Sequence, residues 1–252
     1  MRFLLALCIG AALLAGTALA LAAGTTTQTV TGKATPSRLP EHARAPVTLK
    51  ISETTGTTDP SGVQPPTASA KVFLDRDYLI TTKGLPQCDI AKIEGKSTAE
   101  AKAGCGKALI GSGNTVARVS DGSGGHTDIP GVVTAFNGNP LSHTATAGCD
   151  PVKTKPCIYI HVDLGGPSVV VILEIRRTAG PYGTVFETVP GNPEPIHSLT
   201  LKLHRSYKAG GQTRNYVSAR CADGNLRVKG RFTYSSGPPL SDTSSQRCTV
   251  KP

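Results

Sequence analysis

Ser198-Leu199-Thr200-Leu201-Lys202-Leu203 is the stretch that decides the fold class of this chain. Apolar and polar residues alternate in it without a break, so a β-strand would place the leucines together on one buried face. Two turn signals follow, Gly210-Gly211 and Asp223-Gly224, and each leads into a further strand-like run, at 216–220 and at 226–234. We therefore predict that the last third of the chain is an antiparallel meander.

The same kind of pattern recurs upstream, in short runs separated by residues that are typical of turns. These runs are Val47–Ile51, Ala70–Asp75, Tyr78–Thr82, Thr115–Val119, Val132–Phe136, Ile158–Leu164, Ser168–Ile175 and Tyr182–Val189. Ser168–Ile175 is the most apolar run and is dominated by Val and Ile, which is typical of a central strand buried on both faces. About a dozen short strands with little helix predict an all-β fold, an antiparallel sandwich or jelly-roll-like architecture with one short helix and disulfide-stapled loops.

One helix is predicted in the middle of the chain. Ser97 and Glu100 have the spacing of a capping box, and the alanine-rich residues after them favour a short helix that ends near Leu109. Gly104 and Gly106 weaken this helix because glycine has a low helix propensity. We expect it to lie as a lid over one end of the sheet, without a catalytic role.

The cysteines indicate an oxidising compartment. The chain has seven, and Cys8 falls within the apolar segment of residues 1–23, which leaves an even number for disulfides. Proximity in the sequence favours pairs that each close a short loop, among the many pairings that this number permits. The favoured pairs are Cys88 with Cys105, Cys149 with Cys157, and Cys221 with Cys248. A metal site is disfavoured because no Cys-x-x-Cys pair occurs and no His lies at ligand spacing beside a Cys.

Residues 1–23 have the pattern of a signal peptide. Arg2 supplies the positive charge and Phe3–Leu14 the apolar core, and small residues precede two cleavage positions, so we expect the mature chain to start near Leu21 or Gly24. The apolar run is too short for a convincing membrane span. The expected location is therefore secreted, extracellular or in the cell envelope, with no transmembrane segment in the mature chain.

The rest of the chain is expected to form one domain. The Thr-rich start at Gly24–Gln28 shows no apolar period, which is typical of a flexible leader. The predicted divisions are a signal peptide at 1–23, a flexible leader and first strand at 24–45, and a single β-sandwich domain at 46–252.

The charge balance is basic, with 27 Lys and Arg residues against 17 Asp and Glu residues and a formal net charge of +10. A diffuse positive field favours weak attraction to anionic cell-envelope polymers. Specific nucleic-acid binding is disfavoured because no aromatic residues interleave the basic ones, whose alternation is typical of the solvated face of a sheet. The basic residues considered are Arg176, Arg177, Lys202, Arg205, Arg214, Arg220, Arg227, Lys229 and Arg231.

No catalytic motif is evident. The sequence contains neither His-Glu-x-x-His nor Gly-x-Ser-x-Gly. His161 and Asp163 share one face of a predicted strand, an arrangement that suits a base with an orienting carboxylate or a two-ligand metal site. We favour a solvent-facing polar pair, because one face of an antiparallel strand is normally polar. We therefore predict no catalytic, cofactor-binding or metal-binding residues and no cofactor.

Several scaffold motifs point to a family resemblance. They are Leu85-Pro86 before Cys88, the Ala-rich run into Cys105 with Ala108, Gly111 and Gly113 after it, Tyr182-Gly183-Thr184, and Ser218-Ala219-Arg220-Cys221 leading through Gly224, Leu226, Gly230, Phe232 and Thr233 to Cys248. Together they resemble a group of uncharacterised exported proteins of high-GC Gram-positive bacteria, actinobacterial secreted proteins of unknown function. The resemblance implies the first and last of the three disulfides, and it implies no activity, substrate or functional residue. The segment from Cys149 to Cys157 looks like an elaboration on this pattern.

The favoured hypothesis is an exported, non-enzymatic binding or structural module of the bacterial cell surface or medium, whose ligand is unknown. One alternative is an extracytoplasmic hydrolase with a site built from loop residues, in which His161 and Asp163 would take part. The other is a weak electrostatic binder of anionic polymers.

Overall fold

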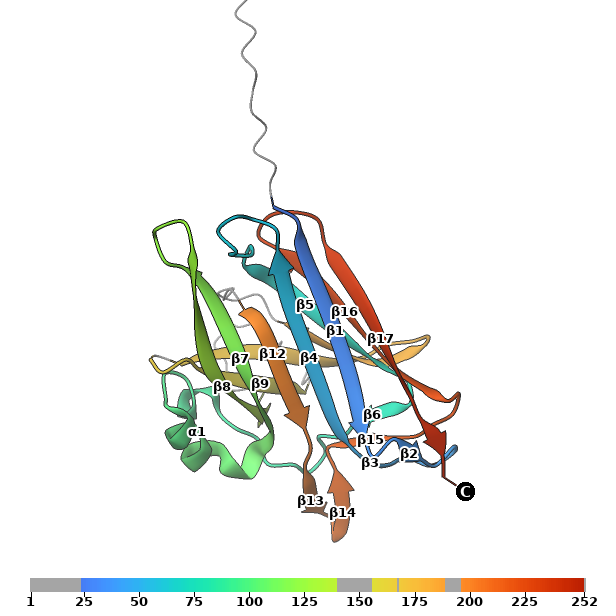
Figure 1. The fold of residues 1–252 in the computed structure, drawn as a ribbon. Helices are drawn as coiled ribbons and strands as arrows, with labels where there is room; N and C mark the ends of the chain where they lie inside the picture. Colours follow the sequence, from blue (N-terminus) through green and yellow to red (C-terminus); the bar gives the residue numbers. More distant parts are fainter. Residues whose placement is uncertain (1–23, 140–155, 167, 189–195, 252) are drawn as a thin grey trace, which may run out of the picture.

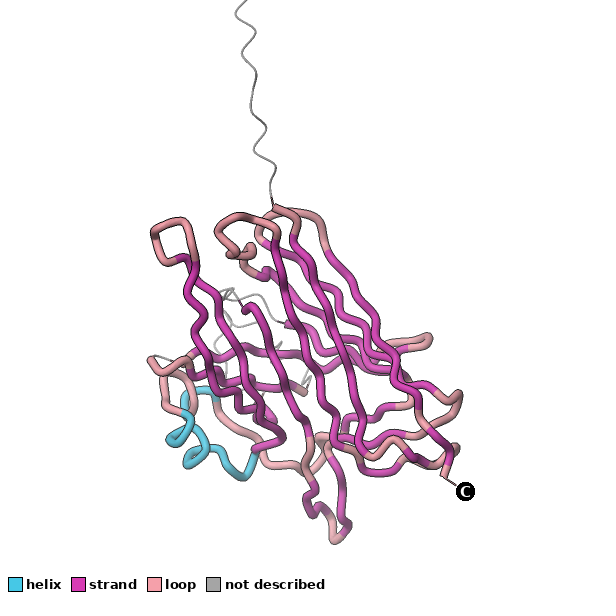
Figure 2. Tube along the Cα trace, viewed as in Figure 1, coloured by secondary structure: helices cyan, strands magenta, loops and turns pink. Residues whose placement is uncertain are grey.

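The computed structural model describes residues 24–139, 156–166, 168–188 and 196–251. Strands make up 61% and helices 7%, so the prediction of an all-β fold is confirmed. Figure 2 shows a single helical region at one corner of a body made of strands. The predicted signal peptide, residues 1–23, lies outside the described residues.

Most strands belong to one antiparallel sheet. In spatial order they are β1 (Thr26–Thr35), β4 (Thr48–Thr57), β12 (Ile196–Leu203), β7 (Leu109–Ser120), β8 (His126–Gly138), β9 (Cys157–Asp163), β10 (Val169–Arg177), β11 (Tyr182–Thr188), β5 (Thr67–Asp75), β16 (Asn225–Tyr234) and β17 (Leu240–Arg247). The sheet folds over, so that β1, β4, β12 and β7 form the near layer in Figure 1 and β5 and β16 lie behind them. This arrangement is sandwich-like, as predicted.

The remaining strands form small sheets at one end of the sandwich. They are β13 (Ser206–Ala209) with β14 (Gln212–Asn215), β15 (Val217–Ala219) between β3 (Ala45–Pro46) and β6 (Tyr78–Ile80), and β18 (Thr249–Val250) parallel to β2 (Arg38–Leu39).

The core lies between the two layers. Alternate residues of each strand point inward, as Leu49 and Ile51 do on β4, Leu201 and Leu203 on β12, and Val228 on β16, and all of them are buried. The strand-like run 168–175 forms β10 in the interior of the sheet, and its apolar residues pack on both faces, as predicted. Val169, Val171, Leu173 and Ile175 face the core, and Val170 and Ile172 face a second apolar cluster.

The second cluster lies under the helix. Helix α1 (Thr98–Cys105) starts at the predicted capping box, in which the Ser97 side chain accepts from Glu100 N and the Glu100 carboxylate accepts from Ser97 N. A short 3-10 helix, Gly106–Ala108, follows it directly. Buried Ala101 of α1 belongs to the same apolar cluster as β8 and β9 residues, so the predicted lid covers part of the outer face of the sheet.

Two predicted disulfides are present, Cys88–Cys105 and Cys221–Cys248. The first ties the end of α1 to the loop before it. Cys157 is also disulfide-bonded, while Cys149, its predicted partner, lies outside the described residues.

One local prediction is wrong, and another is correct only in part. The expected flexible leader at Gly24–Gln28 is already strand from Thr26 onward, because β1 pairs with β4 from Thr26 opposite Thr57, and threonine fits an extended strand well. The expected meander is present only in part: β13 pairs with β14 and β16 with β17, both antiparallel, whereas β12 lies between β4 and β7, and the other neighbour of β16 is β5. Alternation fixes which face of a strand is buried, and it carries no information about the neighbouring strand.

The two edge strands of the main sheet meet through side chains. Backbone N–H groups of β1 donate to acceptors on β17: Val30 N to Asp242 Oδ2 at 2.7 Å, Gly32 N to Ser244 Oγ at 3.0 Å, and Ala34 N to Gln246 Oε1 at 2.5 Å. The Gln246 amide also donates to the carbonyl oxygen of Ala34 at 3.0 Å. We call this set of contacts the seam. It nearly closes the sheet and satisfies donors that an open edge would leave free.

One acidic side chain faces the core beside the seam. Glu53 on β4 lies directly between buried Val30 and half-buried Leu199 of the neighbouring strands, and cross-strand partners share a face. Burial penalises the charged carboxylate and raises the pKa of Glu53 from 4.5 to about 7. The folded protein therefore holds this proton more tightly than the unfolded chain does. The stabilisation is present below the ordinary pKa and is lost as the pH rises through the folded pKa.

The seam can be tested by removing one acceptor. Ser244→Ala leaves the N–H of Gly32 without its partner, and we expect the free energy of unfolding to fall by about 1 to 3 kcal/mol in urea titrations. Ser241→Ala, at an exposed position of the same strand, is the control and should have little effect. Equal effects of the two substitutions would contradict the seam.

The pKa of Glu53 can be tested by its effect on stability. We expect Glu53→Gln to raise the midpoint of thermal unfolding relative to the wild-type protein at about pH 8, with a smaller gain at about pH 5. Calorimetry over this range measures the difference. A difference that does not change with pH would show that Glu53 titrates normally.

Candidate anion-binding site

The predicted His161 and Asp163 pair lies under the start of α1. His161 on β9 is fully buried and its Nε2 lies 2.8 Å from the carbonyl oxygen of Lys96. The Asp163 carboxylate accepts hydrogen bonds from Thr98 N at 2.8 Å and from Thr98 Oγ1 at 2.9 Å. Both bonds lower the pKa of Asp163, and the bond from the backbone N–H has the larger effect. The prediction that this pair faces solvent is therefore wrong for His161, because α1 covers this face of the sheet.

Catalytic groups do not gather elsewhere in the described residues. No cluster of three His, Cys, Asp or Glu side chains there could hold a metal ion. A hollow of about 550 Å³ beside α1 is lined by small residues with Lys92 and Lys107, and it contains no acidic residue or histidine. A second hollow, of about 280 Å³, contains Asp59 as its one acidic residue and no histidine.

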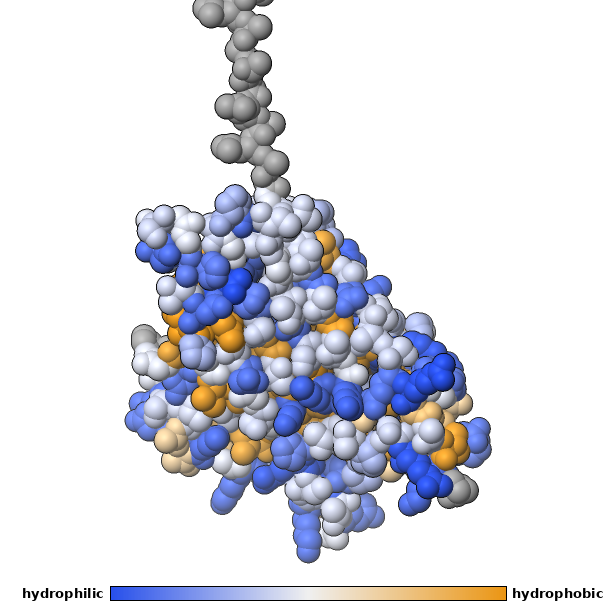
Figure 3. Space-filling view, viewed as in Figure 1, coloured by the Kyte–Doolittle hydropathy of each residue, from blue (hydrophilic) through white to orange (hydrophobic). Residues whose placement is uncertain are grey.

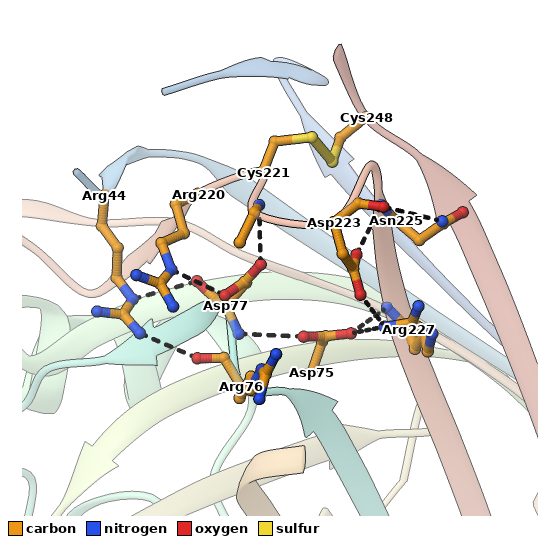
Figure 4. Close-up of polar contacts among 11 residues, drawn as sticks. Arg44, Asp75, Arg76, Asp77, Arg220, Cys221, Asp223, Asn225, Arg227 and Cys248 are labelled. Carbon is orange, nitrogen blue, oxygen red and sulfur yellow. Dashed lines mark hydrogen bonds and ion pairs between the residues drawn. A yellow bond between two sulfur atoms is a disulfide. The ribbon is translucent and has the colours of Figure 1, made fainter. Parts of the chain in front are cut away.

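The densest polar network in the described part of the chain surrounds two buried aspartates. Asp75 ends β5, and Asp77 lies in the turn that leads to β6; each is only 2% exposed. Asp77 accepts from Arg220 Nε at 2.8 Å and from Ala222 N at 3.0 Å. Asp75 accepts from Asp77 N at 3.1 Å and from Arg227 Nη1 at 3.0 Å (Figure 4).

Segments far apart in the sequence build this network. Asp75 is the last residue of β5, and Asp77 belongs to the polar pair Arg76-Asp77 between β5 and β6. Arg220 comes directly before Cys221, whose disulfide to Cys248 is drawn beside the network in Figure 4. The backbone N–H of Cys221 donates to Pro40 O at 2.9 Å. The network is thus fixed by backbone contacts and by a covalent bridge.

Burial dominates the electrostatics of Asp75. It raises the pKa of this carboxyl group, while hydrogen bonds from Asp77 N and from Arg227 act in the opposite direction. Arg227 Nη1 also contacts Asp223 Oδ2 at 2.8 Å, so its charge is shared between two carboxylates.

Three guanidinium groups form a second part of this region, and we call them the arginine cluster: Arg44 and Arg220, which contact Asp77, and Arg177, whose charge acts on Arg44. Arg44 donates to the carbonyl oxygens of Asp77, at 3.1 Å, and Arg76, at 2.9 Å. Arg177 donates to Thr184 Oγ1 at 2.8 Å and to the carbonyl oxygen of Ile80 at 2.9 Å. Among the described residues, Arg220 is the one member of the cluster that contacts a carboxylate, that of Asp77.

The arginine cluster therefore carries more positive charge than its surroundings neutralise. The pKa of Arg44 is lowered, and burial is the largest cause. The positive charges of Arg220 and Arg177 also lower this pKa, whereas the negative charge of Asp77 raises it. Figure 4 shows Arg44 and Arg220 side by side to the left of Asp77. Arg220 contacts Asp77 through Nε, and its Nη groups form no hydrogen bond to any other residue that the structure describes. Planar guanidinium forks of this kind suit carboxylate and phosphate groups.

Sequence reasoning did not find this cluster. It grouped Arg176, Arg177, Arg220 and Arg227 as one solvated face, and it did not include Arg44. In the structure, Arg176 pairs with Glu174 at 2.8 Å and with Glu187 at 3.2 Å. The cluster joins residues from three distant segments, so no spacing in the sequence could signal it.

No family model matches the chain, and comparisons with curated proteins and with solved structures find no match. The resemblance to exported proteins of high-GC Gram-positive bacteria therefore stays a prediction. In the described residues, no helix is both long enough and apolar enough to cross a membrane.

The role of Asp77 as the anchor of the cluster can be tested by substitution. Asp77→Asn removes the buried carboxylate that neutralises Arg220, and we expect the free energy of unfolding to fall by about 3 to 5 kcal/mol. Asp223→Asn is the matched control, because Arg227 keeps Asp75 as a partner; it should cost less than about 1 kcal/mol. Urea titration measures both, and equal losses would contradict the assignment.

Proposed function

We propose that the protein is an exported, non-enzymatic binding module of the cell surface or medium, and that the arginine cluster holds carboxylate or phosphate groups of anionic envelope polymers. The observation that supports this proposal most directly is that Arg44 and Arg177 donate their hydrogen bonds to uncharged oxygen atoms. Their positions are thus fixed while their charges are left for a ligand. The disulfides support the location, since they persist in oxidising compartments.

An anion fits this site for two physical reasons. Its negative charge would relieve the repulsion among three neighbouring guanidinium groups. The donors are also already in place, so binding would order few side chains and would lose little conformational entropy. Hydrogen bonds between such ionised groups are about twice as strong as those between neutral groups.

The alternative function, a hydrolase, depended on His161 and Asp163 as candidate catalytic residues. His161 and Asp163 contact the start of α1, and neither described hollow contains a second acidic residue or a histidine. We therefore do not propose a hydrolytic activity.

The proposal can be tested with inorganic phosphate and acetate as probes. At low salt, we expect both anions to shift the NMR signals of the Arg44 and Arg220 Nε–Hε groups in a saturable way. The double substitution Arg44→Gln with Arg177→Gln should weaken phosphate binding about tenfold or more, as the loss of charge-assisted hydrogen bonds implies.

Arg231→Gln is the control for this experiment, because Arg231 is exposed on β16 and lies outside the cluster. It should bind phosphate as the wild-type protein does. Thermal unfolding of each variant shows that it is folded. Equal phosphate binding by the double variant and the wild-type protein would overturn the proposal.

A further inference from the structure

A row of three lysines crosses the outer face of the near layer. In the register of the sheet, Lys33 on β1 lies directly opposite Lys50 on β4, and Lys50 lies directly opposite Lys202 on β12. All three side chains are exposed, and none of them forms an ion pair with any residue that the structure describes.

This row is electrostatically unfavourable for the free protein. Neighbouring strands are about 4.8 Å apart, and like charges directly opposite each other on a sheet are destabilising. Elsewhere on the same sheet some cations have acidic partners: Lys71 pairs with Glu187 at 2.7 Å, and Arg176 pairs with Glu174. The three lysines of the row have no such partner among the described residues.

Hydroxyl groups cover the face next to the row. The residues one step along the strands are Thr31, Ser52 and Thr200, and those of the next step are Thr29, Thr54 and Ser198. Ser52 Oγ and Thr200 Oγ1 are 3.0 Å apart. We call these nine residues, the three lysines included, the hydroxyl–lysine face.

The hydroxyl–lysine face contains no acidic residue. The outward positions of β1, β4 and β12 carry no Asp or Glu, since Glu53, the acidic residue of these strands, faces the core. In Figure 3 the viewed surface is pale over the upper parts of β1 and β4, and strongly hydrophilic side chains cross its lower part. On β7, the row ends at the exposed hydroxyl of Ser112, opposite Lys202.

We propose that the hydroxyl–lysine face binds an acidic polysaccharide, laid across β1, β4 and β12. Charge complementarity selects the partner: a chain of repeated carboxylate or other anionic groups would neutralise the lysine row, whose members stand one strand apart. The neutral Thr and Ser side chains both donate and accept hydrogen bonds, as sugar hydroxyls do. A nucleic acid is disfavoured because the face holds no aromatic residue for base stacking.

This surface shares no residue with the arginine cluster, so each proposal can fail alone. The arginine cluster is assigned to one carboxylate or phosphate group of an anionic polymer, whereas the hydroxyl–lysine face is assigned to several successive units of an acidic polysaccharide. A variant of the face should keep the response of the arginine cluster to inorganic phosphate. The same titration with the face variant therefore separates failure of the one proposal from failure of the other.

The test uses fluorescently labelled alginate oligosaccharides, which are polymers of uronic acids, with fluorescence anisotropy as the measurement. The triple substitution Lys33→Gln, Lys50→Gln and Lys202→Gln should weaken alginate binding about tenfold or more at low salt. The matched control is Lys83→Gln, Lys208→Gln and Lys251→Gln, which removes the same charge from exposed lysines elsewhere. It should change the affinity no more than about twofold.

A second variant tests the hydroxyl groups without changing the charge. Thr31→Ala, Ser52→Ala and Thr200→Ala should weaken alginate binding and leave the binding of single-stranded DNA unchanged, since only the sugar hydroxyls need these partners. Uncharged dextran should not bind. Far-UV circular dichroism and thermal unfolding establish that each variant is folded.

Three results would overturn the proposal. If the wild-type protein did not bind alginate, the proposed partner would be wrong. If the two triple-lysine variants lost alginate affinity equally, net charge alone would explain the binding. Binding of single-stranded DNA as tight as that of alginate, with the same response to all variants, would show a surface without preference for sugars.

Discussion

The seam between β1 and β17 is the constraint on which the rest of the structure depends. It joins the first and last strands of the main sheet through Asp242, Ser244 and Gln246. Next to the seam, β1 packs closely against Val228 of β16, which is possible because residue 32 is glycine: a Cβ atom there would lie 2.1 Å from Val228 Cγ2. With the edges joined, β1 has its inner face against the core and its threonines outside. The hydroxyl–lysine face exists because of this orientation.

The end of the sandwich that carries the arginine cluster depends on a different set of restraints. There the segment after β1 meets the C-terminal segment, since β18 pairs with β2 and the Cys221–Cys248 disulfide joins the segment after β15 to the end of β17. Asp77 accepts from both Arg220 and Ala222, so a buried carboxylate fixes the same segment. Stability and the proposed binding function thus share one network, in which the carboxylates hold the structure and the surplus guanidinium groups face outward.

Local features were predictable from the sequence because local chemistry determines them. The alternation in 198–203 gave β12 its buried face, the capping box at Ser97 set the start of α1, and proximity identified Cys88–Cys105 and Cys221–Cys248. Strand partners were not predictable, because the alternation of apolar and polar residues does not indicate which strand lies alongside or in which register. Both proposed sites depend on such non-local geometry. The lysine row appears only when β1, β4 and β12 are placed side by side, and His161 is buried only because α1 lies over it.

Amide hydrogen exchange at β1 tests the seam most directly. One edge of β1 pairs with β4. On the other edge, the backbone N–H groups of Val30, Gly32 and Ala34 donate to side chains of β17. The structure predicts slow exchange at all three amides in the wild-type protein, and faster exchange at Ala34 in a Gln246→Ala variant. Exchange of these three amides in the wild-type protein at the rate of an open sheet edge would contradict closure of the sheet by side chains.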